Sequence, residues 1–407
     1  MERRRFIRNL GLGAAAVAVT GCSGEKTDQR PAPGTQAKVE GIRKYTEIGS
    51  TGLRMSDISM GCGGLDNPYV VERALDLGIN YFDTAPDYEN GQSEITLGKV
   101  FKNPAKRDKA IICSKFCERG AYGLHLDLGT PEKDFIRVVE GSLQRLNTDH
   151  IEFMMVHAIG ERVNDQPRLT DPPMLAAAAK LKEQGKILHL NVSSHGPHCM
   201  EDCLLEAIES GYFSSIMPAL NFVQHQRLGD VLTRAAEKKV GVVAMKTLSG
   251  AKEEDLQRFS GEGTDLAQAA FKWVFTKPGI SGLVVTMSTT AAVEKYVAAS
   301  GKELTAEDQT LLNRYAAEMT SHYCRTGCGD CLSACPHEVA IAHILRLDMY
   351  FTAYGDHLKA LREYHHLPRK MKPAVCVTCK GPCTGACPNG VPVRERLLDA
   401  TRRLQLA

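Results

Sequence analysis

The chain has 407 residues, of which 43% are hydrophobic and 24% are charged, and its formal net charge is +2. This length is enough for one large domain and a smaller one. The near-neutral charge gives no indication of a nucleic acid as a partner. Aromatic residues make up only 6% of the chain, which also argues against stacking on nucleic acid bases.

The first residues predict an export signal. Arg3, Arg4 and Arg5 precede an apolar run over 10–19 that is too short to span a membrane, and the arginine pattern resembles a twin-arginine signal. The stretch 19–22 resembles a lipoprotein cleavage box with Cys22 as the lipidated residue, and a plain cleavable signal is the alternative. We therefore predict a signal peptide over 1–21 and a periplasmic or cell-surface location. The lipid on Cys22 would be the protein's contact with a membrane.

A polar stretch rich in Pro and Gly follows, and we expect a flexible tether over 22–43. Between residues 44 and 303, eight short apolar runs then alternate with amphipathic, helix-like stretches such as 93–101 and 131–146. The runs cover 57–61, 79–85, 109–115, 151–158, 187–194, 214–220, 240–246 and 281–287. Eight strands with helices between them, over roughly 250 residues, are typical of the α/β class and of a (β/α)8 TIM barrel. A hairpin with its turn at 50–52 is expected before the first strand.

Four polar side chains fall where the second, third and fourth predicted strands end: Asp83, Tyr88, Lys115 and His157. In such barrels the chemistry sits at the strand ends. Adding hydride to a carbonyl makes an alkoxide that needs a proton, and a Tyr with an ordinary pKa of about 10 donates poorly near neutrality. A neighbouring Lys lowers that pKa, an Asp holds the Lys, and a His orients the carbonyl. Taken singly, Asp83 also fits a helix cap, Lys115 a surface charge and His157 a core histidine.

The stretch FDTAPDY, the pair SK and the His at the end of the fourth strand resemble the aldo-keto reductase family across the whole barrel. The resemblance implies that Tyr88 is the general acid, that Lys115 and Asp83 tune it, and that His157 orients the substrate. The implied substrate is a small-molecule carbonyl or alcohol, and the implied cofactor is NAD(P), with NADP preferred.

The dinucleotide contacts that the resemblance implies are Ser193, Ser194, Asn221, Lys246, Ser288 and Glu294, with Lys246 on a phosphate. Family members hold the nicotinamide amide through polar residues after the fifth strand, where this chain has Ser193, Ser194 and His195, and then stack a Tyr on its ring. Here Met217 and Leu220 stand where a Gln and that Tyr are usual. A nicotinamide site that has lost its function therefore stays open as an alternative.

The predicted C-terminal domain, residues 304–407, contains two cysteine groups. Both groups end in Cys-Pro, and together they form an internal repeat. Their spacing resembles that of bacterial two-cluster ferredoxins, in which the fourth Cys of each group serves the other cluster. One four-iron cluster is thus predicted on Cys324, Cys328, Cys331 and Cys387, and another on Cys376, Cys379, Cys383 and Cys335. Zinc sites and disulfides are the alternatives. Three residues, rather than two, separate Cys324 from Cys328 and Cys379 from Cys383, which leaves the number of intact clusters open.

The export signal favours iron over disulfides, because the twin-arginine route carries proteins that are already folded and loaded with cofactor. Residues 338–367 are amphipathic, and we expect a small, mainly helical ferredoxin-like domain after the barrel. Outside the two groups, Cys62 and Cys113 are expected to be buried. Cys199 and Cys203 are expected to lie on a helix surface, and a metal site that they share with His195 and His198 is the alternative.

The sequence therefore predicts an exported oxidoreductase with 4Fe-4S clusters, whose electrons pass to the barrel site or to a redox partner protein. One alternative is an electron-transfer lipoprotein that uses a catalytically silent barrel as a scaffold. Another is a binding lipoprotein with structural clusters.

Overall fold

The structure is a computed structural model. It describes residues 39–120, 125–161, 164–195, 199–223, 228–251, 253–261, 263–325, 328–353 and 357–405. The predicted signal peptide, most of the tether and Cys22 lie outside these residues. Within them, no helix has both the length and the apolar composition needed to cross a membrane.

Eight parallel strands close into a barrel in the order β10-β3-β4-β5-β6-β7-β8-β9. The strands are β3 (Ile58–Gly61), β4 (Tyr81–Asp83), β5 (Ile111–Lys115), β6 (Ile151–Ile159), β7 (Ile187–Ser194), β8 (Ser215–Pro218), β9 (Gly241–Ala244) and β10 (Ile280–Thr286). They read as nearly continuous apolar runs because helices cover the outer face and side chains fill the interior. The (β/α)8 barrel is thereby confirmed. The predicted hairpin is also present, as β1 (Tyr45–Glu47) paired antiparallel with β2 (Arg54–Ser56).

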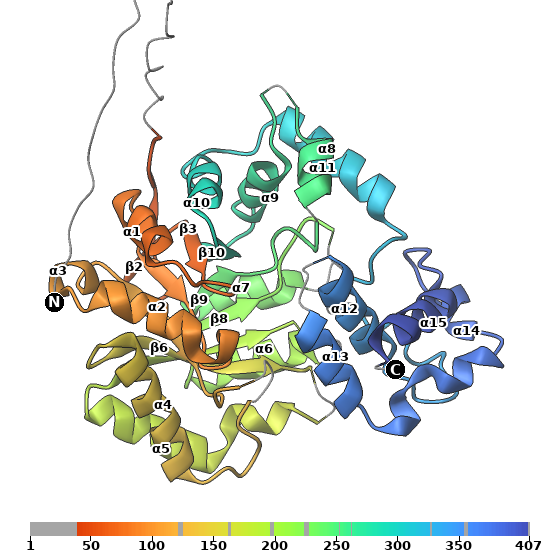
Figure 1. Cartoon of the computed structure of the whole chain (residues 1–407), viewed down its shortest axis with the longest axis horizontal. Helices are drawn as coiled ribbons and strands as arrows, with labels where there is room; N and C mark the ends of the chain where they lie inside the picture. Colours follow the sequence, from red (N-terminus) through yellow and green to blue (C-terminus); the bar gives the residue numbers. More distant parts are fainter. Residues whose placement is uncertain are drawn as a thin grey trace, which may run out of the picture. The chain divides into compact units, whose positions relative to one another are not determined.

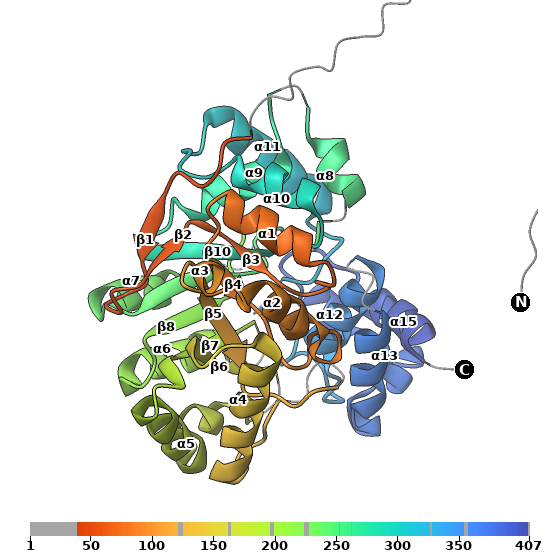
Figure 2. The same ribbon diagram turned by 60° about the vertical axis from the view of Figure 1, so that its left-hand side comes forward.

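Helices alternate with the strands and surround the barrel (Figures 1 and 2). They are α1 (Pro68–Asp76), α2 (Gln92–Phe101), α3 (Pro104–Arg107), α4 (Glu132–Leu146), α5 (Pro172–Glu183), α6 (Met200–Ser210), α7 (Gly229–Glu237), α8 (Glu253–Phe259), α9 (Leu266–Val274) and α10 (Thr290–Val297). The 3-10 turns η1 (Tyr88–Gly91) and η2 (Gln166–Thr170) lie in the loops after β4 and β6. Local sequence sets where these helices begin: Asn67 caps α1 by accepting from the Tyr69 N–H, and Pro68 occupies its first turn.

Helix α11 (Ala306–Met319) follows the predicted domain boundary at residue 303, but it packs with the barrel. Thr305 and Asp308 form a capping box at its start. Its buried side chains Leu312 and Tyr315 belong to the same hydrophobic core as the barrel helices. The barrel core therefore extends to about the end of α11.

The remaining helices share a second hydrophobic core, which contains Ile344, Leu347 and Leu397. They are α12 (Ile341–Thr352), α13 (His357–His366), α14 (Pro382–Gly385) and α15 (Val393–Leu404), with the 3-10 turns η4 (Arg369–Met371) and η5 (Pro373–Val377). The amphipathic stretch expected over 338–367 thus supplies two helices, α12 and α13. Asp348 on α12 accepts from Arg403 on α15 at 2.7 and 2.9 Å, which ties the two helices together.

Candidate active site and cysteine-lined cavities

Asp83 and Lys115 form a buried ion pair at the ends of two neighbouring strands, β4 and β5. The Lys115 Nζ donates to Asp83 Oδ1 and to the carbonyl oxygen of Thr84, both at 2.7 Å. Tyr88 begins the turn η1 that follows β4, and its ring centroid lies 4.8 Å from the Lys115 Nζ. The structure therefore brings the predicted carboxylate, ammonium and phenol together at one mouth of the barrel.

The protonation states of Lys115 and Tyr88 suit a site that donates a proton. Burial lowers the pKa of Lys115, but the Asp83 carboxylate, with Tyr88 and Cys113, raises it more, so its pKa stands well above its ordinary value. For Tyr88 the net direction differs from the sequence expectation. Burial raises the pKa of Tyr88 more than the Lys115 ammonium lowers it, so the phenol holds its proton in the substrate-free site.

His157 lies within β6, next to β5, and it is almost fully buried. Burial holds the pKa of His157 well below its ordinary value, and the charges of His125, Lys115 and His195 act in the same direction. The His157 imidazole is therefore neutral. Its ring centroid lies 4.5 Å from that of His125, an edge-on neighbour that the sequence reasoning missed, since an isolated His in a loop gives no periodic signal.

Two of the serines predicted to contact the dinucleotide hold β7 to β6 instead. The Ser193 Oγ accepts from the Ala158 N–H at 2.9 Å, and the Ser194 Oγ donates to the Ile159 carbonyl oxygen at 2.7 Å. Both serines are fully buried. Their hydroxyl groups therefore already serve the barrel wall.

The other predicted dinucleotide residues are also engaged within the chain, apart from the exposed Ser288. The Asn221 amide donates to the Lys246 carbonyl at 3.3 Å, and its oxygen accepts from the Val223 N–H at 3.1 Å. Glu294 accepts from Arg73 on α1 at 2.8 and 2.9 Å. These contacts make them loop-fixing and helix-pairing residues in this structure.

Helix α12 meets the barrel at the ends of β7 and β9. The Lys246 Nζ donates to the Tyr350 hydroxyl at 3.0 Å, and it also lies 4.9 Å from the ring centroid of that tyrosine. Arg346, one turn earlier on α12, donates to the His195 carbonyl, and its Nη1 lies 3.1 Å from His195 Nδ1. The barrel positions that the family resemblance assigns to the cofactor are thus in contact with the C-terminal helices.

The eight C-terminal cysteines are not in disulfides. Burial, together with the nearby thiols of Cys331, Cys328 and Cys387, raises the pKa of the Cys324 thiol to about 12. The same four cysteines line one cavity together with Pro388 and Val391. The structure therefore brings the fourth cysteine of the second group to the first three of the first group.

The second set shows the reciprocal arrangement. Burial raises the pKa of Cys376 to about 11, and Cys383, Cys335 and Cys379 contribute in the same direction. Cys383 in turn is influenced by Cys335 and Cys379. The residues present therefore fit two four-cysteine sites divided as the sequence predicted.

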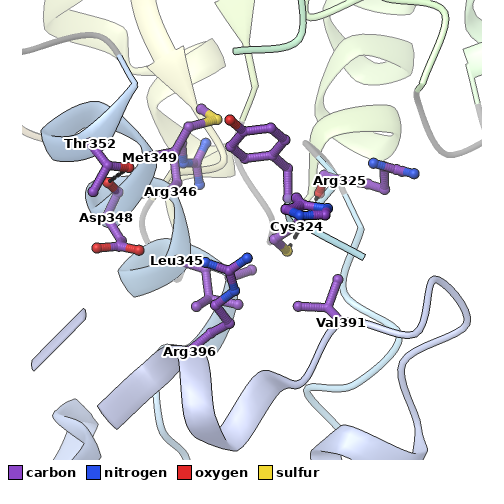
Figure 3. Close-up of a pocket in the computed structure, with 12 residues that line it drawn as sticks. Cys324, Arg325, Leu345, Arg346, Asp348, Met349, Thr352, Val391 and Arg396 are labelled. Carbon is purple, nitrogen blue, oxygen red and sulfur yellow. Dashed lines mark hydrogen bonds between the residues drawn. The ribbon is translucent and has the colours of Figure 1, made fainter. Parts of the chain in front are cut away.

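A pocket adjoins the first set of cysteines, between Cys324 and the start of α15 (Figure 3). Arg325, Arg346 and Arg396 line it along with Cys324. Arg346 thus contacts both this pocket and His195 at the barrel mouth.

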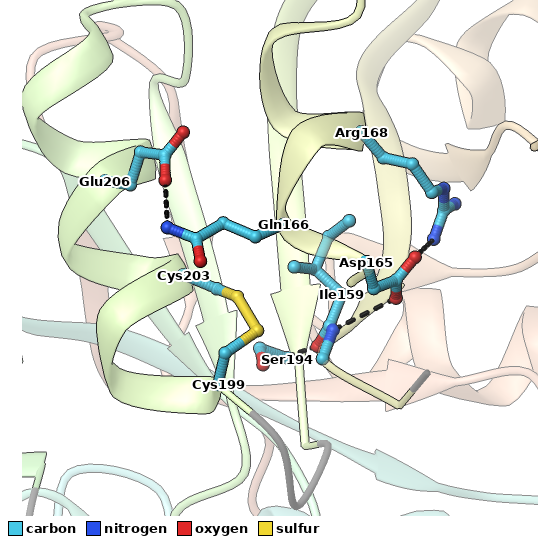
Figure 4. The surroundings of a disulfide bond; sticks show 9 residues. Ile159, Asp165, Gln166, Arg168, Ser194, Cys199, Cys203 and Glu206 are labelled. Atoms are coloured by element: carbon cyan, nitrogen blue, oxygen red, sulfur yellow. Dashed lines mark hydrogen bonds and ion pairs between the residues drawn. A yellow bond between two sulfur atoms is a disulfide. The ribbon is translucent and has the colours of Figure 1, made fainter. Parts of the chain in front are cut away.

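Cys199 and Cys203 form a disulfide at the N-terminal end of α6 (Figure 4). The sequence predicts that both lie on a helix surface, without a bond between them. The bridge lies beside the ends of β6 and β7, where Ser194 is bonded to Ile159. Gly160 has a φ of 82°, and a Cβ there would meet the Cys199 sulfur at 3.2 Å. Glycine at this position therefore lets the chain turn closely past the disulfide.

A buried lysine–aspartate pair thus lies beside a tyrosine and a neutral histidine at the strand ends of a (β/α)8 barrel. Residues 67–261 match the aldo/keto reductase family model. This part of the chain is an aldo/keto reductase family domain, and the protein is an oxidoreductase of that type. The family typically binds NAD(P). The match ends before both cysteine groups.

Similar proteins match a part of this chain. The chain is 29% identical over 242 residues to the aldo-keto reductase YhdN of Bacillus subtilis, covering 55% of this chain and 68% of that protein. It is 26% identical over 284 residues to L-galactose dehydrogenase of Arabidopsis thaliana, covering 62% of this chain and 86% of that protein. A solved aldo-keto reductase from Pseudomonas aeruginosa superimposes with a TM-score of 0.54 at 27% identity, over 65% of this chain and 98% of its own.

Proposed function

We propose that this protein is an exported iron–sulfur oxidoreductase in which the barrel interconverts a carbonyl and an alcohol, and two 4Fe-4S clusters exchange the electrons. The observation that carries the proposal is the position of Arg346. It lines a pocket with Cys324, a predicted cluster ligand, and it bonds to His195 at the barrel mouth. The cysteine module is therefore attached to the substrate end of the barrel.

The donor set supports iron–sulfur clusters over zinc. A tetrahedral zinc ion with bonds of about 2.3 Å to sulfur holds its four sulfurs about 3.8 Å apart. Among the described residues, the one group of three or more ligand atoms within 4.8 Å of one another is Asp87, His125 and His157, and it contains no cysteine. The sulfurs of the first set, Cys324, Cys328, Cys331 and Cys387, instead surround a cavity, as a larger inorganic unit requires. Arg325 and Arg346 place positive charge beside these thiols.

Bound clusters would supply single electrons, and the overall conversion of a carbonyl to an alcohol takes two electrons and two protons. The Tyr88 hydroxyl would supply one proton to the substrate oxygen, and solvent water would supply the other to the substrate carbon. Lys115 stays charged beside Tyr88, and the neutral His157 can hydrogen-bond the substrate oxygen.

The cofactor contacts support this route over a diffusible nicotinamide. The Lys246 ammonium, assigned by resemblance to a phosphate, is bonded to Tyr350, and His195 is bonded to Arg346. A dinucleotide held at these positions would have to displace α12 side chains. We therefore derive no step through NAD(P). A redox partner protein would supply or remove the electrons.

Two further observations support export. The arginine-rich start resembles a twin-arginine signal, and the Cys199–Cys203 disulfide suits an oxidising compartment. We propose that the clusters are inserted in the cytoplasm before export, and that a lipid on Cys22 then retains the protein at a membrane surface.

Anaerobic purification with measurement of iron, sulfide and bound nucleotide tests the cofactor content. We expect about eight irons per chain, an absorbance that bleaches on reduction, and no tightly bound dinucleotide. Colourless, iron-free protein with paired cysteines would overturn the proposal. One mole of NADP retained per mole of chain would overturn the electron route but leave the clusters standing.

Reoxidation of the reduced protein by a panel of carbonyl compounds tests the barrel chemistry. Tyr88→Phe should slow substrate-dependent reoxidation by about 100-fold or more, because a general acid contributes that much. Tyr69→Phe is the matched control, since Tyr69 is 71% exposed on α1. If Tyr88→Phe matched the control with every substrate while a partner protein was still reduced normally, the barrel would be a scaffold and the protein an electron carrier.

A further inference from the structure

Asp87, His125 and His157 bring three metal-ligand atoms within 4.8 Å of one another. The three residues come from separate parts of the barrel mouth: the loop after β4, the loop after β5, and β6. Their exposed fractions are only 2%, 7% and 3%. A set of this kind is formed by the tertiary fold, and the spacing of the three residues along the sequence does not suggest it.

The chemistry of the three groups fits a divalent transition-metal ion. Two imidazoles and one carboxylate are a ligand set found in catalytic zinc sites and in non-haem iron(II) sites, and three protein ligands leave coordination positions open for water or substrate. With metal–ligand bonds of about 2.0–2.2 Å, ligand atoms around a tetrahedral ion lie about 3.3–3.6 Å apart. The ligand atoms here lie within 4.8 Å of one another, so the side chains would have to close by at most about 1.5 Å when the ion binds.

The two rings are already close. His125 and His157 lie edge-on at 4.5 Å between ring centroids, and one ring nitrogen of each belongs to the group of ligand atoms within 4.8 Å of one another. A divalent ion there would bind both rings and the Asp87 carboxylate.

We propose that Asp87, His125 and His157 bind one divalent transition-metal ion at the barrel mouth, of the class of Zn²⁺, Fe²⁺ or Mn²⁺. This site is separate from the cysteine cavities and goes beyond the proposed function. Asp87 directly precedes Tyr88, and His157 is the residue assigned to the substrate oxygen. With the ion bound, the ion itself would contact the carbonyl or hydroxyl oxygen as a Lewis acid, in place of the hydrogen bond from His157.

Zn²⁺ alone is the probe, added to the cluster-loaded protein and followed by desalting and elemental analysis of zinc and iron. We expect about one zinc per wild-type chain, with iron unchanged, and at least about 100-fold weaker zinc binding in His125→Gln and Asp87→Asn, since even outer-shell changes cost 10- to 100-fold. His189→Gln is the matched control. His189 is a half-buried imidazole near the other end of β7, bonded to Ser214 at 3.1 Å.

Three outcomes would overturn the proposal. The first is wild-type protein that retains no zinc at loaded clusters. The second is zinc retained equally by His125→Gln and Asp87→Asn, which would show adventitious binding. The third is zinc that appears only as iron is lost, which would place it on the cysteines. Unchanged iron content and visible absorbance in the two variants show that they fold, and they leave the cluster proposal unaffected by a negative result.

Discussion

Replacing Lys115 with Met tests the buried charge pair and the proton-donating site together. The Lys115 side chain is 2% exposed and that of Asp83 is 6% exposed, and the two are joined at 2.7 Å. Lys115→Met leaves the Asp83 carboxylate buried without its cation, and breaking such a pair costs about 3–5 kcal/mol of unfolding free energy. The Thr84 carbonyl oxygen also loses its 2.7 Å donor. We expect a clear loss of stability, along with a loss of turnover of about 100-fold or more.

The control is a second buried pair in the barrel, which joins α3 to β6. Arg107 contacts Glu152 at 2.9 Å, and their side chains are 8% and 7% exposed. Glu152 lies near the start of β6, whereas His157 lies near its end. Arg107→Met should therefore destabilise the barrel by a similar amount without changing turnover per folded molecule.

Urea unfolding under anaerobic conditions measures the stability of both variants, and substrate-dependent reoxidation of the reduced clusters measures turnover. The double variant Asp83→Asn/Lys115→Met should recover part of the lost stability, because it removes the stranded charge. Equal turnover in Lys115→Met and Arg107→Met would refute the assignment of Lys115 to the active site. A double variant less stable than the sum of its single changes would refute the ion-pair explanation.

Three further predictions concern the clusters, the barrel packing and the pH response. Cys331→Ser should lose about four of about eight irons, whereas Cys62→Ser, at a buried barrel thiol, should lose none; equal iron in both would contradict the ligand assignment. Gly98→Ala should destabilise the barrel by about 1–3 kcal/mol, because its Cβ would meet the Arg145 carbonyl oxygen at 2.1 Å, whereas Gly385→Ala, with no atom within 4 Å, should be nearly neutral. Burial lowers the pKa of His195 to about 3, so the unfolded chain binds this proton near pH 6.5 and the folded one does not, and stability is lost as pH falls. Between about pH 7 and 5.5 the unfolding free energy should fall by about 1 kcal/mol because of His195. Urea unfolding of His195→Gln should show a fall that is smaller by about this amount, and a fall equal to that of the wild-type protein would contradict the prediction.

The barrel could be predicted from sequence because strands that are buried on both faces have nearly continuous apolar runs. The run ILHLNVSS reads as one strand and forms one, Ile187–Ser194. Strand ends follow from strand positions, so Asp83, Lys115 and His157 could be placed at one mouth without coordinates. The position of Cys387 beside the first cysteine group could be predicted too. In the two-cluster ferredoxins that the Cys-Pro repeat resembles, the fourth cysteine of each group lies with the other group.

Features that depend on tertiary environment could not be predicted. The pKa of Tyr88 rises because its burial outweighs Lys115, and the degree of burial is a property of the folded loops. His125 reaches His157 from a loop with no periodic pattern. Cys199 and Cys203 are four residues apart, a spacing that fits a helix surface as well as the disulfide that forms.

The contact between α12 and the barrel links two features that look independent in the sequence. One is the set of barrel positions expected to bind the cofactor, and the other is the group of helices that follows the barrel. Arg346 and His195 are 151 residues apart, and Tyr350 and Lys246 are 104 apart, so no local pattern relates them. Once they are in contact, the barrel positions expected to hold a dinucleotide hold the cysteine module instead. Relaxed selection on a nicotinamide site would leave Lys246 and His195 without new partners, whereas here both contact one helix. These contacts therefore support the proposed electron route over a simple loss of cofactor binding.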